Sequence, residues 1–349
     1  MKTAVYDVLG PEGFGTYEVE WENGPRFTRV SRPPRGTLVP GFVDIHFHGG
    51  FGIDFMTCEA NELAILFDRL AKVGYEKCLL TTVTAPLEEV KLAIAKIPEH
   101  DVVAGFHLEG PFISPVFPGA QPKRFIIDPP VIASPWDEVL DDPRLRIITL
   151  APERPHALEF TARMMEQGAI VSIGHTNATY EEARRGFEFG ASHATHTFNA
   201  MRPFHHREAG TVGYVLHQEG IMAELIYDRH HVSFEAAELL LQVKGADHVV
   251  AVSDGTCASG MPNGSQHDMW GQIATVHHGE VRLENGTLAG SAITLADAFQ
   301  NLYVDFGPEV AIKLCCINPR KALKMTGPPR VWLEFDEELE LVARHEVRS

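Results

Sequence analysis

The sequence predicts an α/β fold: a (β/α)8 barrel of the TIM type with a small β-sandwich domain built from both chain ends. Between residues 38 and 326, apolar strand-like runs alternate with segments whose apolar residues recur every three or four positions, which is typical of parallel β-α-β units. Eight such runs occur, and eight strands close a barrel. An open doubly wound sheet is the alternative, but no G-x-G-x-x-G sequence follows an early strand.

The composition bounds the class of protein. The chain has 349 residues, of which 44% are hydrophobic and 22% are charged, as in an ordinary globular protein. It has no run of about 18 apolar residues and no apolar signal-peptide core, so we expect no membrane partner and a cytoplasmic location. Five cysteines without a C-x-x-C pair indicate reduced thiols. A formal net charge of −17 disfavours nucleic acid as a partner.

Both chain ends have the texture of short β structure. Residues 1–37 and 327–349 contain strand-like runs separated by glycine and proline, and each end is too short to form a stable domain alone. We expect the two ends to pair as one β domain beside a catalytic barrel at residues 38–326, with two unrelated flanking hairpins as the alternative. The runs are Thr3–Val8, Thr16–Trp21, Phe27–Val30, Val331–Glu334 and Leu339–Val342.

The barrel elements are predicted from apolar, β-branched runs and from helical periodicity. The strands are Leu38–Ile45, Lys77–Thr81, Val102–Phe106, Leu145–Leu150, Ala169–Ile173, Ser192–Thr195, Ile221–Ile226 and His248–Val252. Helices between them include Ala60–Val73, Leu87–Ile97, Pro155–Gln167, Tyr180–Phe189 and Ser233–Val243. Gly168 and Gly190 follow two of these helices, where helices commonly end. We expect a β insertion at Trp270–Leu288 and later helices at Thr294–Phe306 and Pro308–Met325.

The first barrel strand ends in His46-Phe47-His48-Gly49-Gly50. Alternate side chains of a strand share a face, so both imidazoles can point to one spot, and the glycines let the chain turn tightly. Two histidines on one face form half of a metal site, although a histidine-rich strand end without a ligand would have the same sequence. The other strand ends decide between the two.

Five further predicted strands carry a histidine, glutamate or aspartate at or just beyond their C-terminal ends, where barrel enzymes hold their active sites. We therefore predict a divalent metal site with one or two ions. Imidazole ligands favour zinc, with iron, cobalt and nickel as alternatives. Glu109, His175 and His196 could hold one ion, and the two histidines of the first strand a second, with Glu109 bridging. Asp254 is the best general base, and it could also be a ligand.

At these segments the chain resembles the amidohydrolase superfamily and, within it, the N-acetylglucosamine-6-phosphate deacetylase family. The matching segments are Pro40–Gly49, His107–Phe112, Gly174–Thr179, Thr195–Met201, Arg207–Glu208 and Val252–Asp254. The resemblance implies a metal-dependent barrel with a small β domain, a homodimer and an amino-sugar phosphate as substrate. It implies metal ligation by Glu109, His175, His196, His46 and His48, acid and base catalysis by Asp254, and substrate contacts by Gln121, Asn199, Ala200, Arg207, His231, Leu288, Ala289 and Gly290.

Departures from the family pattern bear on the substrate. Gln121 stands where the family usually has a histidine that polarises the acetyl carbonyl, and an amide donates a hydrogen bond but carries no charge. Arg229 stands where the family tends to have glycine, so a special backbone conformation there would be strained. Its side chain either contacts an anion or points to solvent. Arg207 has the forked geometry that phosphate oxygens favour, with an ion pair to Glu208 as the alternative.

The leading hypothesis is hydrolysis of N-acetylglucosamine 6-phosphate to glucosamine 6-phosphate and acetate. A metal hydroxide attacks the amide, Gln121 helps to stabilise the oxyanion, and Asp254 acts as acid and base. The first alternative keeps this chemistry on a different N-acyl amino sugar or an N-acyl amino acid. The second is a non-catalytic metal-bound binding protein, which has no need of a base such as Asp254.

Overall fold

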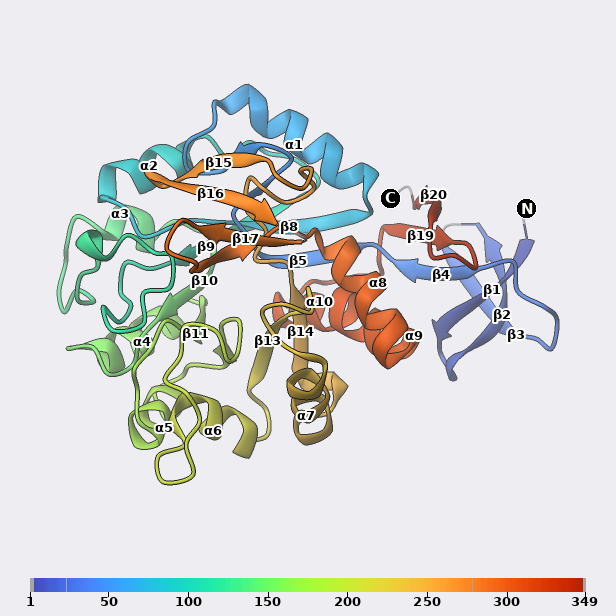
Figure 1. Ribbon diagram of the computed structural model, residues 1–349. Coiled ribbons are helices and arrows are strands. Elements are labelled where there is room, and N and C mark those ends of the chain that lie inside the picture. The colour runs from blue at the N-terminus through green and yellow to red at the C-terminus, as the bar shows by residue number, and fades with distance from the viewer. Residues whose placement is uncertain (1–2, 23, 278, 348–349) are drawn as a thin grey trace.

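The computed structural model describes residues 3–22, 24–277 and 279–347, and its centre is an eight-stranded parallel barrel (Figure 1). Neighbouring strands follow the order β5 (Phe42–Phe47), β8 (Tyr75–Thr81), β9 (Val103–Glu109), β10 (Leu145–Leu150), β11 (Ile170–Ile173), β12 (His193–Ala194), β13 (Met222–Ile226) and β14 (Val249–Val252). The sheet closes between its first and last strands, where Phe47 forms a parallel bridge with Gly255. Each of the eight predicted strands overlaps a strand of this barrel, so the barrel prediction is confirmed.

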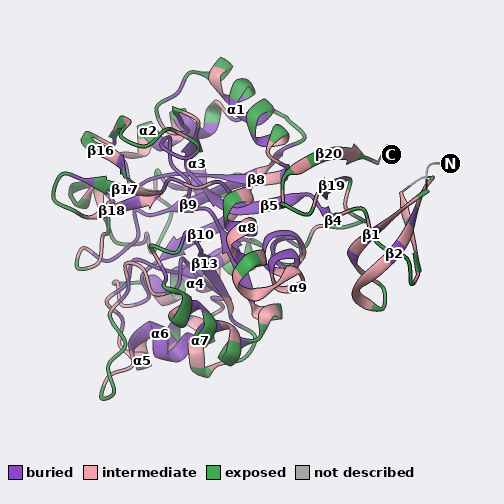
Figure 2. Ribbon diagram, turned by 45° about the vertical axis from the view of Figure 1, so that its right-hand side comes forward, coloured by how far each residue is buried: buried purple, intermediate pink, exposed green. Residues whose placement is uncertain are grey.

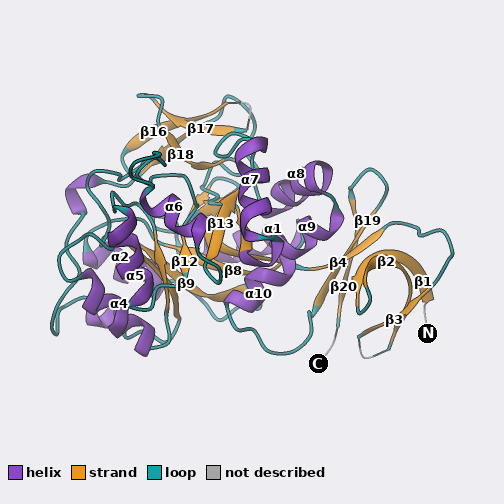
Figure 3. Ribbon diagram, turned by 90° about the horizontal axis from the view of Figure 1, so that it is seen from below, coloured by secondary structure: helices purple, strands orange, loops and turns teal. Residues whose placement is uncertain are grey.

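Helices surround the barrel (Figure 3). They are α1 (Ala60–Lys72), α2 (Leu87–Ala95), α3 (Asp137–Leu140), α4 (Ala157–Glu166), α5 (Tyr180–Glu188), α6 (Gly210–His217), α7 (Phe234–Lys244), α8 (Leu295–Phe306), α9 (Pro308–Ile312) and α10 (Asn318–Ala322). In α1 the buried residues Leu63, Leu66, Phe67 and Leu70 recur every three or four positions, which gives the helix one apolar face toward the sheet. No helix within the described ranges has the length and apolar character that a membrane crossing requires.

The single helix predicted at Pro308–Met325 is wrong. The segment divides into α9, a π-helical turn at Lys313–Ile317, and α10. Pro319 lies in the first turn of α10 and has no backbone N–H, so it cannot donate to the carbonyl four residues earlier. The regular helix therefore breaks in front of it.

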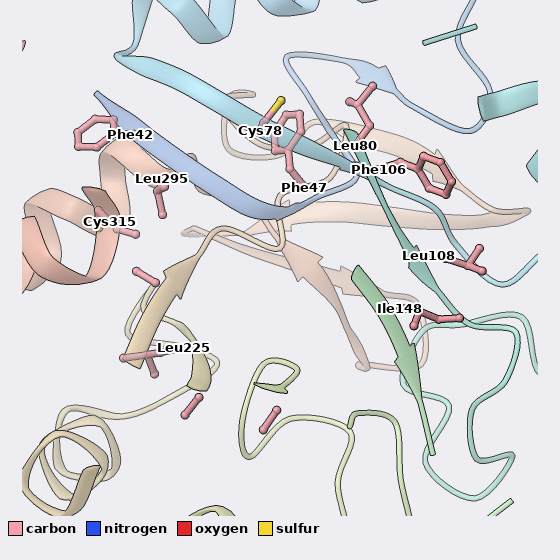
Figure 4. Close-up of a cluster of buried hydrophobic side chains, with 14 of the residues drawn as sticks. Phe42, Phe47, Cys78, Leu80, Phe106, Leu108, Ile148, Leu225, Leu295 and Cys315 are labelled. Atoms are coloured by element: carbon pink, nitrogen blue, oxygen red, sulfur yellow. The ribbon is translucent and has the colours of Figure 1, made fainter. Parts of the chain in front are cut away.

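The main core lies between the barrel and its helices, where aromatic and aliphatic side chains from successive strands meet (Figure 4). Phe42, Phe47, Leu80, Phe106 and Leu108 are all fully buried there. Figure 2 shows the same division, with buried strands inside and exposed residues on the outer helices. This packing holds the strand ends, and hence the side chains on them, in fixed positions.

The strands of the two chain ends lie in one six-stranded sheet beside the barrel, near both termini (Figure 1). Its order is β20 (Leu341–Glu346), β19 (Val331–Phe335), β4 (Thr37–Pro40), β1 (Thr3–Gly10), β2 (Gly13–Trp21) and β3 (Pro25–Arg29). The sheet has its own apolar cluster, which includes Tyr6, Tyr17, Leu38 and Trp332. Both chain ends therefore contribute to one layer.

The first predicted barrel strand, Leu38–Ile45, is wrong as a single element. It divides into β4, which pairs with β19 in the end sheet, and β5, which pairs with β8 in the barrel. The break falls at Gly41, where a Cβ atom would lie 2.7 Å from Glu76 Cβ and 2.9 Å from Val331 Cβ. Only glycine lets the chain pass between these neighbours.

The predicted β insertion is larger than the sequence indicates. It forms a four-stranded antiparallel sheet of β15 (Gln266–Met269), β16 (Gln272–His277), β17 (Glu280–Leu283) and β18 (Leu288–Ser291). In Figure 3 this sheet lies on a different side of the barrel from the end sheet. A second small hairpin, β6 (Gly49–Gly50) with β7 (Ile53–Asp54), follows β5 directly.

Candidate functional site

The histidine and carboxylate side chains predicted at the strand ends meet at one end of the barrel. His46 lies on β5 and Glu109 ends β9, whereas His175, His196 and Asp254 each lie two residues beyond β11, β12 and β14. These last three residues have φ values of 45°, 30° and 46°. A left-handed backbone conformation costs a non-glycine residue about 1–3 kcal/mol. Residues in such conformations cluster at active sites, where the surrounding structure holds them in place.

Six side chains form two groups whose ligand atoms, one per residue, lie within 4.8 Å of one another. The Glu109 group consists of Glu109, His175 and His196, and the His48 group consists of His46, His48 and Asp254. Glu109 Oε1 is 3.1 Å from Nε2 of both His175 and His196, and 3.3 Å from Nε2 of His46. Its other oxygen, Oε2, is 3.3 Å from Nε2 of His48. Glu109 therefore lies between the groups, where a bridging ligand would be.

Hydrogen bonds to the outer imidazole nitrogens fix the direction of the lone pairs. Nδ1 of His175 is 3.2 Å from the Phe117 carbonyl, and Nδ1 of His48 is 3.1 Å from the Thr81 carbonyl. A carbonyl oxygen only accepts, so both Nδ1 atoms donate and both Nε2 atoms turn a lone pair into the site. The Nε2 atoms of His46 and His48 are 3.2 Å apart. Nitrogen and carboxylate donors that converge in this way fit a borderline divalent ion such as zinc or iron.

The charges of the two groups depend on one another. Burial lowers the pKa of His48, but the nearby Asp254 and Glu109 carboxylates outweigh it and raise the pKa to about 9. Burial likewise opposes ionisation of Asp254, but His46 and His48 hold its pKa down at about 2. The carboxylates thus stay ionised and attract positive charge into the site. A divalent ion that binds here displaces imidazole protons, so the affinity for metal decreases as the pH falls.

A cavity of about 380 Å³ opens above the two groups. Predicted substrate-contact residues that line it are Gln121, Asn199, Ala200, His231, Leu288 and Gly290. Residues of the lining that the sequence did not indicate are Gly119, Ala120, Trp270, Arg282 and Thr287. Its size suits a small sugar derivative, and five of the six ligand side chains, all but that of His46, line it.

Comparison with known proteins places this arrangement in a family. The sequence profile described as the amidohydrolase family matches residues 37–327. The chain belongs to the amidohydrolase family. Amidohydrolases depend on metal ions, and each of the two groups could hold one.

Relatives of this amidohydrolase include two bacterial enzymes with related names. The N-acetylglucosamine-6-phosphate deacetylase of Lysinibacillus sphaericus is 36% identical over 88% of this chain and 82% of that protein. The N-acetylgalactosamine-6-phosphate deacetylase of Escherichia coli O157:H7 is 33% identical over 83% of this chain and 79% of that protein. The crystal structure of the Thermotoga maritima N-acetylglucosamine-6-phosphate deacetylase has a TM-score of 0.88 at 31% identity, covering 98% of this chain and 97% of that chain.

Two predicted substrate contacts of the amidohydrolase lie outside the cavity lining. Ala289 is fully buried in the apolar cluster of the insertion, so its side chain does not reach the cavity. Arg207 is exposed, and its Nη1 is 2.8 Å from His206 Nε2 rather than paired with Glu208. Glu208 instead accepts from the Tyr180 and Gly210 backbone N–H groups. The phosphate role of Arg207 therefore stays a prediction.

Gln121 lines the cavity and also fixes the position of Glu109. Its side-chain N–H donates to Glu109 Oε2 at 2.7 Å, and its carbonyl accepts from the Thr84 backbone N–H at 2.7 Å. The amide is thus oriented by both neighbours. One N–H of Gln121 already has an acceptor, which leaves the second for a substrate oxygen.

The loop after β13 carries His231, which lines the cavity, and Arg229, which does not. Nδ1 of His231 is 2.6 Å from Asp228 Oδ2; burial lowers the pKa of His231, but this hydrogen bond raises it overall. Arg229 has a φ of 66°, which is the strain expected at that position. Its guanidinium donates twice to Asp305 of α8, at 2.7 and 2.8 Å. The side chain pairs with Asp305 and is still 44% exposed to solvent, and a contact between Arg229 and a substrate anion stays a prediction.

Glu224 is a functional residue that the sequence reasoning missed. It lies in the middle of β13 and is fully buried. Its Oε2 accepts from the His196 backbone N–H at 3.2 Å and lies 3.3 Å from His46 Nδ1. A carboxylate behind a metal-ligating histidine orients the ring and raises its basicity. The available signal was a lone glutamate inside the apolar strand Met222–Ile226, because charged residues are rarely buried without a partner.

Proposed function

We propose that this amidohydrolase removes the acetyl group from N-acetylglucosamine 6-phosphate, releasing acetate and glucosamine 6-phosphate. The observation that carries the proposal is the convergence of the Glu109 group and the His48 group beneath a cavity of sugar size. Relatives that bear this name at 36% and 34% identity support the substrate. A Mycobacterium smegmatis deacetylase of the same fold, with a TM-score of 0.88 at 26% identity, has been solved in complex with N-acetyl-D-glucosamine-6-phosphate.

We propose two divalent ions per chain, with zinc favoured over iron, cobalt and nickel. Each group offers three ligand atoms, which leaves an open position for water or substrate, as catalytic sites require. Ions bound there would lower the pKa of water toward about 7 and polarise the amide carbonyl. The buried carboxylates of Glu109 and Asp254 would balance part of the positive charge.

Asp254 is the residue placed to move protons. It lines the cavity as an ionised carboxylate. It takes a proton from the attacking water and then donates it to the departing nitrogen. The water oxygen thus joins the acetyl carbon while the C–N bond breaks, and the sugar leaves as a free amine. The second N–H of Gln121 is available to the carbonyl oxygen as negative charge develops on it.

The phosphate would be held by cationic side chains at the opposite side of the cavity from β8. His231 is buried, and its pKa is raised by Asp228 after burial has opposed it, so it can carry a positive charge toward an anion. Arg207 is exposed and does not line the cavity of its own chain. This position suits the expected homodimer, in which Arg207 of a second subunit would complete the phosphate site. Arg207→Ala should then weaken only phosphorylated substrates.

The test is amine release by metal-loaded protein from N-acetylglucosamine 6-phosphate, its galacto epimer and unphosphorylated N-acetylglucosamine. The epimer is the second candidate, since the Escherichia coli relative is named for it. Asp254→Asn should lower kcat by about 10²–10⁴-fold, while metal content shows whether the ions remain. Full turnover in that variant would overturn the assignment of the base. A loaded wild-type protein that binds the sugar phosphate but releases no amine would favour the binding-protein alternative.

A further inference from the structure

The turn at the tip of the β15–β16 hairpin has an unusual residue. Met269 pairs with Gln272, so Trp270 and Gly271 form a two-residue loop. Their φ values are 57° and 85°, the pattern of a type I′ turn, where asparagine, aspartate and glycine are preferred. A tryptophan is a poor choice for the backbone of this turn. Something other than the turn must account for the side chain.

The indole of Trp270 reaches the metal cavity. It belongs to the cavity lining together with His48, Gln121 and Asp254. Its ring centroid lies 5.8 Å from that of His48, at an interplanar angle of 68°. The indole N–H is buried and has no hydrogen-bond partner among the described residues. A donor left in this state beside a ligand cavity is available to a bound molecule.

A second and larger cavity, of about 820 Å³, is also lined by this residue. Trp270 lines both cavities. The lining of the second cavity is mixed. Its apolar side chains include Met56, Val83, Ala85, Leu92, Pro122 and Phe125, and its charged residues are Asp54, Glu59, Glu89, Lys96, Arg124 and Asp268. A hydrogen bond from the Thr84 N–H to Gln121 also lies between the two cavities, because Thr84 lines the larger cavity and Gln121 lines the smaller one. Trp270 and this hydrogen bond together form the partition between the cavities.

The order of the barrel strands orients a substrate between these walls. Asn199 and His231 follow β12 and β13, whereas Thr84 follows β8, which lies four strands from β12 around the barrel. An anionic group held at the β12–β13 side and an amide held at the two ligand groups leave the N-acyl substituent directed toward the β5–β8 side. Trp270 lies there, next to His48, which follows β5.

We infer that Trp270 contacts the N-acyl group of the substrate and limits its length, by closing the metal cavity toward the larger cavity. This inference rests on the proposed deacylation. The short acyl chain of an acetyl group fits in front of the indole. A longer chain would need the space that the indole occupies, and removal of the indole would give it access to the apolar side chains of the larger cavity.

The experiment compares kcat/KM for the N-acetyl, N-propionyl and N-butyryl forms of glucosamine 6-phosphate. Trp270→Gly suits it, because glycine is favoured at a φ of 57° and the turn should form at least as readily. We expect the butyryl-to-acetyl ratio of kcat/KM to rise at least tenfold in this variant, since one methylene in a pocket changes the ratio by about 10–200-fold. Trp270→Phe keeps most of the wall and should keep the wild-type ratio.

Ile273→Ala is the matched control, because Ile273 lies on the same hairpin but is 43% exposed and lines neither cavity. It should leave the ratio unchanged. An unchanged ratio in Trp270→Gly, with acetyl hydrolysis intact, would overturn the inference and leave the proposed function standing. Failure of the wild-type enzyme to hydrolyse all three compounds would overturn the proposed function and the acyl assignment with it.

Discussion

Glu224 should control how tightly the His48 group holds its ion, and Glu224→Gln is the sharpest perturbation. The substitution removes one negative charge but keeps the shape of a fully buried side chain. The remaining amide oxygen can still accept from the His196 backbone N–H and from His46 Nδ1. The fold and the Glu109 group should therefore persist, while the orienting carboxylate behind His46 is lost.

The distances set the expected magnitude. Loss of such an outer partner typically costs 10–100-fold in metal affinity, which is about 1.4–2.7 kcal/mol. The contact between Glu224 Oε2 and His46 Nδ1 is 3.3 Å, longer than the roughly 2.7–2.9 Å of a strong charge-assisted hydrogen bond. We therefore expect about tenfold weaker binding of one ion in Glu224→Gln. Glu224→Ala, which leaves both donors without an acceptor, should approach 100-fold.

The assay is metal content per chain by mass spectrometry, combined with a competitive chelator titration. The wild type should show two ions, and Glu224→Gln should show one ion of unchanged affinity and one that is weaker. Glu224→Ala also removes the acceptor of the His196 backbone N–H, so it should weaken the Glu109 group as well. Glu334→Gln is the control, because Glu334 is also a largely buried carboxylate but lies in the end sheet, where it accepts from Tyr6. Two ions held with wild-type affinity in both Glu224 variants would refute the reasoning.

Two further predictions concern stability. Burial lowers the pKa of His193 to about 4, so the unfolded chain, with a histidine pKa of about 6.5, binds more protons between these values. The contribution of His193 to the free energy of unfolding is therefore full above about pH 6.5, and about 2–3 kcal/mol of it is lost by pH 4.5. Urea titrations at the two pH values should show a smaller loss in His193→Leu than in the wild type. Equal losses in the two proteins would contradict this prediction. Phe42→Ala should cost about 3–5 kcal/mol in urea unfolding, because Phe42 is fully buried against the Phe299 and Phe335 rings at 5.1 and 6.2 Å. Phe42→Leu should cost clearly less, and a similar cost would argue against this packing.

The barrel and its ligand residues could be predicted because both follow from local pattern and one geometric rule. Alternation of strands and helices implies parallel pairing, and parallel pairing brings all the strand ends to one rim. His46 and Glu109 could thus be assigned to one site although 63 positions separate them in the chain. The division at Gly41 could not be predicted, because it depends on Glu76 and Val331, which approach only in the folded chain.

The contacts of residues whose role depends on a distant partner could not be predicted from the sequence. Arg229 has its partner in Asp305, and Trp270 has its neighbour in His48, and neither pair shares a motif or a spacing. In each case the residue conflicts with its local structure. Arg229 and Trp270 both occupy left-handed backbone, and Glu224 interrupts an apolar strand. Residues that conflict with their local structure are therefore good candidates for long-range contacts.

Gln121 shows how such a contact changes the meaning of a substitution. A histidine at this position could bring positive charge to the carbonyl, and the amide cannot. The amide instead donates to Glu109 and accepts from the Thr84 N–H. It therefore fixes the position of the Glu109 carboxylate and contributes to the partition between the two cavities that Trp270 lines. The positive charge that Gln121 lacks would have to come from elsewhere, and the His48 group is the nearest place that can hold it, because Glu109 lies within 3.3 Å of His46 and His48. On this argument, loss of the ion from the His48 group should impair this enzyme more than a relative with a histidine at that position.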